Sequence, residues 1–182
     1  VHTVIIGSGF GGLAAARELS LRGLNDFLIL ERSSGIGGVW HNTRYPGLAC
    51  DIPSFLYSYS YFQNPNWSRQ FAPGPEIKKY LEAFSDYLGV RDRVLLNTEV
   101  KRAMFDEQTG TWNLQMVNGD EIQCNFLIAA TGQQHTPKYP NYPGQEKFKG
   151  TATHSARWDT RLTNEFLKGK KIGLIGTGAS AV

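Results

Sequence analysis

Short apolar runs that end in glycine-rich turns divide the start of this chain into alternating strands and helices. Residues 4–6 and 27–31 are short apolar runs, and residues 12–24 between them are rich in Ala and Leu. Short apolar runs bounded by turns indicate buried parallel strands, and the longer segment between them indicates a helix. The pattern therefore predicts a strand-helix-strand unit.

A long loop and a second helix are predicted next. Residues 33–75 are dense in Gly, Pro, Ser and Tyr, and a loop of that length is more often functional than passive. Pro75 is suited to open a helix and Gly89 to end it. Between them the apolar positions fall on one helical face, which predicts core packing: Ile77, Tyr80, Leu81, Phe84 and Leu88.

The pattern then changes to short strands. Residues 94–96 and 100–105 are expected to form strands, followed by a hairpin in which apolar and polar positions alternate before the turn Asn118-Gly119. This part is interpreted as an antiparallel sheet inserted before the chain returns to the buried strands. Residues 126–130 return as a buried strand, and the prolines that follow exclude regular structure near the expected domain boundary. Residues 170–182 then begin a second strand-turn-helix unit.

Composition limits the possible partners and the compartment. The net charge is +3 with Lys and Arg scattered along the chain, so no nucleic-acid surface is predicted. No apolar run approaches the roughly 18 residues of a membrane-spanning helix. Cys50 and Cys124 form no CxxC pattern, which favours buried structural thiols and a cytoplasmic location. The histidines His2, His41 and His135 lack metal-ligand spacing, so no metal site is expected.

Two glycine-spaced turns predict two dinucleotide sites. Gly7, Gly9 and Gly12 have the GxGxxG spacing between strand and helix, and Glu31 follows at the end of the next strand. The glycines allow the backbone to approach a pyrophosphate, and Glu31 is placed to accept hydrogen bonds from a ribose diol. This favours FAD or NAD over NADP in the first site. The alternative is a structural glycine turn with a surface glutamate.

The second turn contains Gly176, Gly178 and Ala181, with Thr177 and Ser180 able to bind a pyrophosphate. The residue that would choose between a ribose hydroxyl and a 2′-phosphate is expected after Val182. At 182 residues the chain is too short for two complete nucleotide-binding domains. The sequence is therefore interpreted as a piece of a larger protein.

Further glycine motifs favour FAD in the first site. Residues 33–40 resemble the second glycine cluster of the glutathione-reductase-like flavoproteins, and Ala130-Thr131-Gly132 resembles the turn that closes over FAD in that superfamily. The redox cysteine pair of the disulfide reductases is missing, because Val39, Trp40 and His41 stand in its place. The resemblance implies a Rossmann-like FAD-binding domain with a parallel sheet, helices and an antiparallel β-meander.

A fingerprint between the two turns resembles that of the Baeyer-Villiger monooxygenases. It consists of Phe148, Gly150, His154, Trp158 and Asp159. The related N- and S-oxygenating flavin monooxygenases share most of it but usually lack the closing Asp. The resemblance implies transfer of one oxygen atom of O2 to a ketone through a C4a-peroxyflavin, giving an ester or lactone, with NADPH as reductant. The alternatives are an N- or S-oxygenating enzyme and a non-catalytic FAD-binding module.

The resemblance also assigns roles to residues. Asp51 is expected to be catalytic, because the matching Asp orients an essential Arg that lies outside this chain. His154 is expected on a linker that supports domain movement rather than in the chemistry. The resemblance and the two glycine motifs together give the expected cofactor-binding set: Gly7, Ser8, Gly9, Phe10, Gly12, Glu31, Arg32, Gly38, Val39, Trp40, Tyr45, Asp51, Ile52, Tyr57, Val100, Ala130, Thr131, Gly132, Gly176, Thr177, Gly178 and Ser180.

The expected organisation has three parts. Residues 1–140 would form an FAD-binding domain that lacks its C-terminal portion, residues 141–169 a linker with the fingerprint, and residues 170–182 the start of an NADP-binding domain. The expected partners are a small ketone and O2, without nucleic acid or membrane. The sequence leaves the oligomeric state and the identity of the substrate open.

Overall fold

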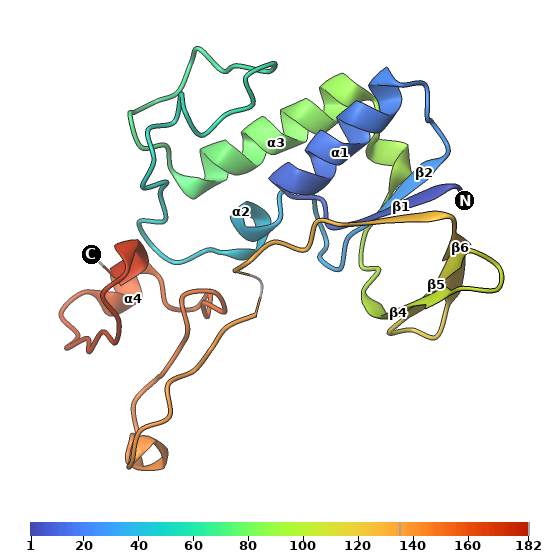
Figure 1. Ribbon diagram of the computed structural model, residues 1–182. Coiled ribbons are helices and arrows are strands. Elements are labelled where there is room, and N and C mark those ends of the chain that lie inside the picture. The colour runs from blue at the N-terminus through green and yellow to red at the C-terminus, as the bar shows by residue number, and fades with distance from the viewer. Residues whose placement is uncertain (135, 182) are drawn as a thin grey trace.

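The centre of the molecule is a parallel sheet. The computed structural model describes residues 1–134 and 136–181, so His135, which was not expected to bind a metal, lies outside the described residues. The strands β1 (Thr3–Ile6), β2 (Phe27–Leu30), β3 (Val94–Leu95) and β7 (Phe126–Ala129) pair in the order β3-β2-β1-β7. Every pairing is parallel. The predicted strand-helix-strand unit and the returning apolar strand are both confirmed (Figure 1).

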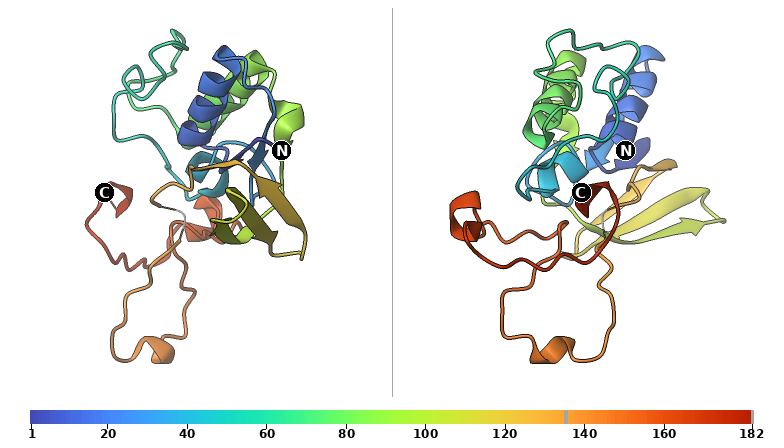
Figure 2. Two further views of the ribbon diagram at one scale, coloured as in Figure 1. Left: turned by 45° about the vertical axis from the view of Figure 1, so that its right-hand side comes forward. Right: turned by 90° about the vertical axis from the view of Figure 1, so that its left-hand side faces the viewer.

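Two helices cover one face of this sheet. Helix α1 (Phe10–Leu21) and helix α3 (Gly74–Leu88) lie side by side, as the turned views of Figure 2 also show. Ile5 and Ile29 are fully buried against them. Helix α1 begins and ends earlier than predicted, because its last turn closes at Arg22 and Gly23 adopts a φ of +73°.

The predicted boundaries of α3 are nearly those of the structure. Pro75 lies in its first turn, and Gly89 ends the helix in the left-handed conformation with a φ of +65°. Glycine adopts that conformation without the steric cost that a side chain would add. The apolar face of α3 is buried as expected, with Ile77, Leu81 and Phe84 at most 1% exposed.

An antiparallel sheet covers the opposite face. It contains β4 (Val100–Asp106), β5 (Thr111–Met116) and β6 (Glu121–Cys124), with the predicted turn at Gly119. Successive residues of a strand point to opposite faces, so Val4 packs on this sheet while Ile5 packs on the helices. One expectation was wrong: residues 94–95 belong to the parallel sheet, because β3 pairs with β2.

The long loop between β2 and α3 is held in place by internal hydrogen bonds. It contains the short helix α2 (Val39–Asn42) and otherwise irregular backbone. Ser54 is 2% exposed, and its hydroxyl accepts a hydrogen bond from Ala72 N (2.7 Å) and donates one to Gln70 O (2.9 Å). The Cys50 N–H donates to Ala72 O (2.9 Å). These contacts fasten the middle of the loop to the segment just before α3.

Ser54→Ala should destabilise this loop. The substitution leaves the buried N–H of Ala72 without its acceptor, which costs about 1–3 kcal/mol. Urea unfolding at neutral pH measures the change, and Ser60→Ala at an exposed position of the same loop is the control. Equal stability of the Ser54 variant and the wild type would show that another group replaces the hydroxyl.

The segment after β7 extends away from the two sheets (Figures 1 and 2). Its regular elements are short: a 3-10 turn at Gln145–Lys147, helix α4 (Asn164–Leu167) and a 3-10 turn at Ala179–Ala181. The strand predicted at the start of residues 170–182 is not formed, and Ile172, Leu174 and Ile175 are 63–68% exposed. A parallel strand needs neighbouring strands, and the described residues supply none there. None of the described helices is long and apolar enough to cross a lipid bilayer.

Candidate nucleotide-binding site

The first glycine turn joins β1 to α1 with very close backbone packing. Gly7 has a φ of +101°, and its N–H donates to Leu30 O (2.8 Å). A Cβ added to Gly7 would lie 2.5 Å from Ala130 O, and one added to Gly12 would lie 1.8 Å from Gly7 O. These positions therefore exclude side chains, as the GxGxxG pattern predicts.

The N-terminus of α1 is available to an anion. Its first residues leave backbone N–H groups without helical partners and carry a partial positive charge. No side chain caps α1 at Gly9, and its first turn contains no acidic residue. Such a terminus binds a phosphate well.

The second glycine cluster lies against the first turn. Gly37 N–H donates to Ser8 O (3.1 Å), and a Cβ added to Gly38 would lie 3.1 Å from Gly9 Cα. Ala130, in the turn after β7, borders Gly7 on the other side. The structure thus brings together three segments that the sequence separates by many residues.

Glu31 is buried between the same segments. Its side chain accepts hydrogen bonds from the backbone N–H and hydroxyl of Ser8 (2.9 and 2.7 Å) and of Ser33 (2.9 and 2.6 Å). Burial raises the pKa of Glu31, but these donors outweigh it and hold the pKa below its ordinary value. A ribose diol at this carboxylate would replace the serine hydroxyls, while the backbone N–H bonds could remain. The partnership with Ser33 was not predicted from the sequence.

Glu31→Gln should destabilise the protein by about 2–3 kcal/mol at neutral pH, because an amide nitrogen would face backbone donors. The carboxylate's stabilising contribution is present above its unfolded pKa and is lost as the pH falls through its lowered folded pKa. Urea unfolding at pH 7 and at acidic pH measures both effects. Glu18→Gln on the exposed side of α1 is the control. A variant with wild-type stability at pH 7 would contradict this account.

Aromatic side chains form a wall beside the N-terminus of α1. Tyr57 lies between Phe10 and Trp40, with ring centroids at 4.9 and 5.6 Å, and its hydroxyl accepts a hydrogen bond from Trp40 Nε1 (3.2 Å). Burial raises the pKa of Tyr57, and the nearby charge of Asp51 adds to this effect. Asp51 itself is exposed. The structure therefore places the expected catalytic carboxylate beside this wall.

The aromatic wall continues into the core through Tyr59, which was not predicted as a site residue, and Tyr80, which was predicted only as part of the buried helix face. The Tyr59 hydroxyl donates to Phe10 O (2.6 Å), and the Tyr80 hydroxyl accepts from Tyr59 N (2.8 Å). Burial strongly raises the pKa of Tyr59. The available signal was the density of tyrosines in Tyr57-Ser58-Tyr59-Ser60-Tyr61.

Other residues of the expected set lie around this centre. Thr98 N–H donates to Glu31 O (2.9 Å), which brings the segment before Val100 next to Glu31. Arg32 follows Glu31 directly, and Val39 begins α2. Ile52, Thr131 and Gly132 are exposed. Thr131 borders the first glycine turn, because a Cβ added to Gly7 would lie 3.8 Å from Thr131 Cα.

The second glycine turn is not built like the first. Gly176 has a φ of +133°, yet among the described residues no strand leads directly into this turn. Thr177 and Gly178 are exposed. Ser180 accepts a hydrogen bond from the Tyr45 hydroxyl (3.1 Å). This contact joins the second turn to the long loop of the first site.

The fingerprint residues contact their neighbours in the sequence. The Phe148 ring packs on Gly150, where an added Cβ would lie 2.5 Å from it. His154 Nδ1 accepts from Ala156 N (3.0 Å), and Trp158 Nε1 donates to Leu162 O (3.2 Å). Arg161 pairs with Asp159 at 2.6 Å and lowers the Asp159 pKa to about 2. Each of these contacts joins two residues that are close together in the sequence.

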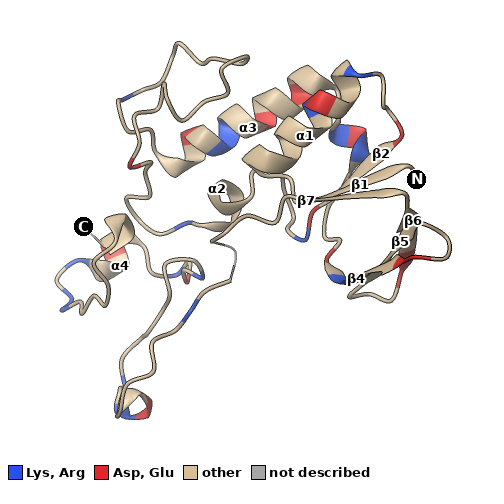
Figure 3. Cartoon of the chain, viewed as in Figure 1, with Lys and Arg blue, Asp and Glu red and all other residues tan. Residues whose placement is uncertain are grey.

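Charge and thiols add little to the site. Lys, Arg, Asp and Glu are spread along the whole chain, and Lys and Arg outnumber Asp and Glu in the segment after β7 (Figure 3). Cys50 and Cys124 are both buried, as expected, and burial raises the pKa of both thiols. Within residues 1–134 and 136–181, no group of three His, Cys, Asp or Glu side chains is placed to hold a metal ion.

Comparisons with known proteins agree on one group of relatives. Residues 5–81 match the family described as NAD(P)-binding Rossmann-like domain. The chain is 43% identical over all its residues to a Baeyer-Villiger monooxygenase of Streptomyces coelicolor. It superposes over its full length on cyclohexanone monooxygenase (TM-score 0.89, 31% identity) and over 88% on an OTEMO complex with FAD and NADP (TM-score 0.80, 33% identity).

The chain spans about a third of the length of these relatives: 34% of the Streptomyces protein, 36% of the cyclohexanone monooxygenase chain and 31% of the OTEMO chain. The similarity therefore covers the glycine turns, the long loop and the fingerprint.

Proposed function

The chain belongs to the Baeyer-Villiger monooxygenase family, and from this we propose that the protein uses FAD and NADPH to transfer one oxygen atom of O2 to a small ketone, giving an ester or lactone. The observation that carries the proposal is the meeting of the two glycine clusters and the Ala130 turn around the N-terminus of α1. This arrangement fits a dinucleotide whose pyrophosphate lies between glycines.

The residues of the first site fit FAD. Gly9 and Gly38 leave the space that a Cβ would fill, and the uncapped helix N-terminus provides donors and positive charge for the pyrophosphate. Glu31 is placed for the ribose of the adenosine half, and its charge disfavours a 2′-phosphate there. Trp40 and Tyr57 provide an apolar wall for a flat ring system.

When bound, the flavin supplies the redox chemistry with NADPH and O2. The chain's own residues bind and orient the cofactor and exclude water from one side of it. Asp51 is proposed to hold a positively charged partner next to the flavin. Its exposed position directly after Cys50, which packs with Trp40 and Tyr57, supports this role.

We propose the same three parts for the chain that its sequence suggested. Residues 1–140 belong to the FAD-binding domain, residues 141–169 form the linker, and residues 170–182 belong to the nicotinamide-binding domain. The described residues do not by themselves form a nicotinamide site, because the second turn lacks its strand. NADPH as reductant is supported by relatives that are described as complexes with NADP. The buried, unpaired thiols support a cytoplasmic location.

Two classes of substrate, offered separately, test the proposed reaction. The protein expressed from its complete gene is incubated with NADPH, ¹⁸O2 and either a ketone or an organic sulfide, and the products are identified by mass spectrometry. We expect a labelled ester or lactone from the ketone. Labelled sulfoxide without ester from any ketone would favour a heteroatom oxygenase, and no labelled product would favour an FAD-binding module without oxygenase activity.

A further inference from the structure

His41 is interlocked with the segment that carries the second glycine cluster. Its side chain is 8% exposed. A Cβ added to Gly35 would lie 2.3 Å from His41 Cε1 and 2.6 Å from Nδ1, so the imidazole occupies the space that glycine leaves. Gly37 is also in contact with His41, since its added Cβ would lie 3.4 Å from His41 Cβ. The ring thereby fixes the path of residues 35–37.

The hydrogen bonding of His41 suits a neutral ring. Nε2 lies 3.3 Å from the Ser34 hydroxyl, and Nδ1 is buried with no hydrogen-bond partner within the part of the chain that the structure describes. A neutral imidazole can leave one nitrogen as an unused acceptor, but an imidazolium carries N–H donors on both nitrogens. Protonation would therefore bury an unpaired charged donor.

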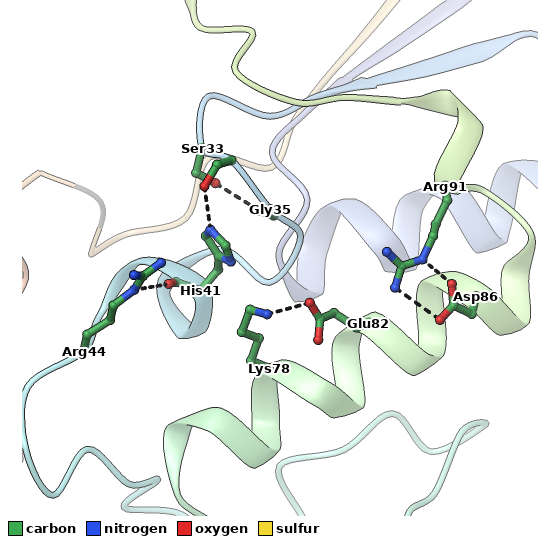
Figure 4. Close-up of polar contacts among 9 residues, drawn as sticks. Ser33, Gly35, His41, Arg44, Lys78, Glu82, Asp86 and Arg91 are labelled. Atoms are coloured by element: carbon green, nitrogen blue, oxygen red, sulfur yellow. Dashed lines mark hydrogen bonds and ion pairs between the residues drawn. The ribbon is translucent and has the colours of Figure 1, made fainter.

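The basic side chains around His41 act in the same direction as its burial. Lys78 on α3 and Arg44 after α2 lie near His41, as does Glu82 on α3 (Figure 4). Glu82 and Glu31, which directly follows β2, oppose the effect of the two cations. Glu82 is already paired with Lys78 at 2.6 Å. Burial, then Lys78 and Arg44, lower the pKa of His41. A cavity of about 370 Å³ lined also by Arg91 borders the ring, which gives protons a path from the solvent.

The interlocked segment leads directly into the proposed FAD site. Gly37 N–H donates to Ser8 O (3.1 Å), His41 N–H donates to Gly38 O (3.1 Å), and Gly38 packs on Gly9. A change in the path of residues 35–37 would move Gly38 away from the first glycine turn. Movement of the His41 ring would thus shift Gly38, which lies beside the proposed position of the pyrophosphate.

We propose that His41 is a positioning residue of the dinucleotide site: its neutral ring, seated against Gly35, holds the second glycine cluster on the first, and protonation of the ring weakens cofactor binding. This inference rests on the proposed function, because the dinucleotide is taken to be FAD. Neither the motifs nor the relatives assign this role to His41.

The pH dependence of FAD binding tests this role. Since the bound state favours neutral His41, affinity is complete above the pKa of His41 in the free protein, which lies below the ordinary histidine value. Below that pKa it falls by at most about tenfold per pH unit. FAD is titrated into the apoprotein expressed from its complete gene, with flavin fluorescence as readout, between pH 7.5 and 5.5. His41→Gln should remove this fall, whereas the control His2→Gln should keep it.

A pair of substitutions tests the steric fit independently. Gly35→Ala should raise the Kd for FAD and lower the unfolding temperature, because its Cβ collides with the ring. Adding His41→Ala removes the ring, so the double variant should bind FAD more tightly than Gly35→Ala alone. If His41 had only a general structural role, the double variant would bind FAD more weakly than either single variant.

The outcomes separate this inference from the proposed function. A wild-type protein that binds no FAD at pH 7.5 would overturn the proposed function and this inference together. FAD binding whose pH dependence is the same in wild type and His41→Gln would overturn the positioning role alone. A double variant that binds FAD no more tightly than Gly35→Ala alone would also overturn it.

Discussion

Gly12→Ala should yield a protein that is purified with almost no flavin and has lost about 3 kcal/mol or more of its stability. The added Cβ would lie 1.8 Å from Gly7 O and 2.9 Å from Gly7 C, which are backbone atoms of the turn itself. Helix α1 would have to move away from β1 to remove this clash, because backbone atoms cannot rotate aside as a side chain does. That movement also displaces the N-terminus of α1 from the pyrophosphate.

Flavin content, measured from the absorbance ratio at about 450 and 280 nm, and urea unfolding test this expectation. Gly11→Ala is the matched control: Gly11 is exposed in the same helical turn, and its added Cβ would meet only Ala130 Cβ at 3.6 Å. Alanine is favoured over glycine in helices by about 1 kcal/mol, so this variant should keep its flavin. Equal flavin content in both variants would show that the packing at Gly12 does not matter for binding.

Asp51→Ala should keep FAD but lose oxygenation, by about 100-fold or more in kcat, because an oriented charge beside a reacting group contributes on that scale. Asp51 is exposed and lies outside the buried clusters, so its removal leaves the packing of Trp40 and Tyr57 unchanged. Its proposed effect is on the position of a cationic side chain near the flavin.

Flavin content, NADPH oxidation and ester formation from a ketone are measured for Asp51→Ala and for Asp92→Ala, an exposed carboxylate in the 3-10 turn at Arg91–Arg93. The second variant should match the wild type in all three. Loss of FAD from Asp51→Ala in proportion to its loss of activity would show that Asp51 binds the cofactor and has no separate role in oxygenation.

The local motifs were predictable because each depends on short-range geometry. The spacing of Gly7, Gly9 and Gly12 already requires a tight turn before a helix, and the structure confirms both the turn and the reason for the third glycine. The amphipathic pattern after Pro75 likewise specified the buried face of α3. Such features need no knowledge of distant residues.

Features that depend on how the chain folds back on itself were missed or wrong. The pairing of Glu31 with Ser33, the seat of His41 against Gly35, and the contact of Tyr45 with Ser180 all result from how the loop folds back. Residues 172–175 have the composition of a buried strand but are exposed, because strand formation needs neighbours that the described residues lack. Sequence periodicity indicates a capacity for pairing but does not supply the partner.

The identity of the bound cofactor tests the central claim most directly. The protein is expressed from its complete gene, purified without added nucleotide and denatured, and the released small molecules are quantified by chromatography and mass spectrometry. Our account predicts FAD in a ratio of about one per chain, as expected for a single site built from the two glycine clusters. Release of a nicotinamide dinucleotide in that ratio without flavin, or failure of the apoprotein to take up added FAD, would contradict it.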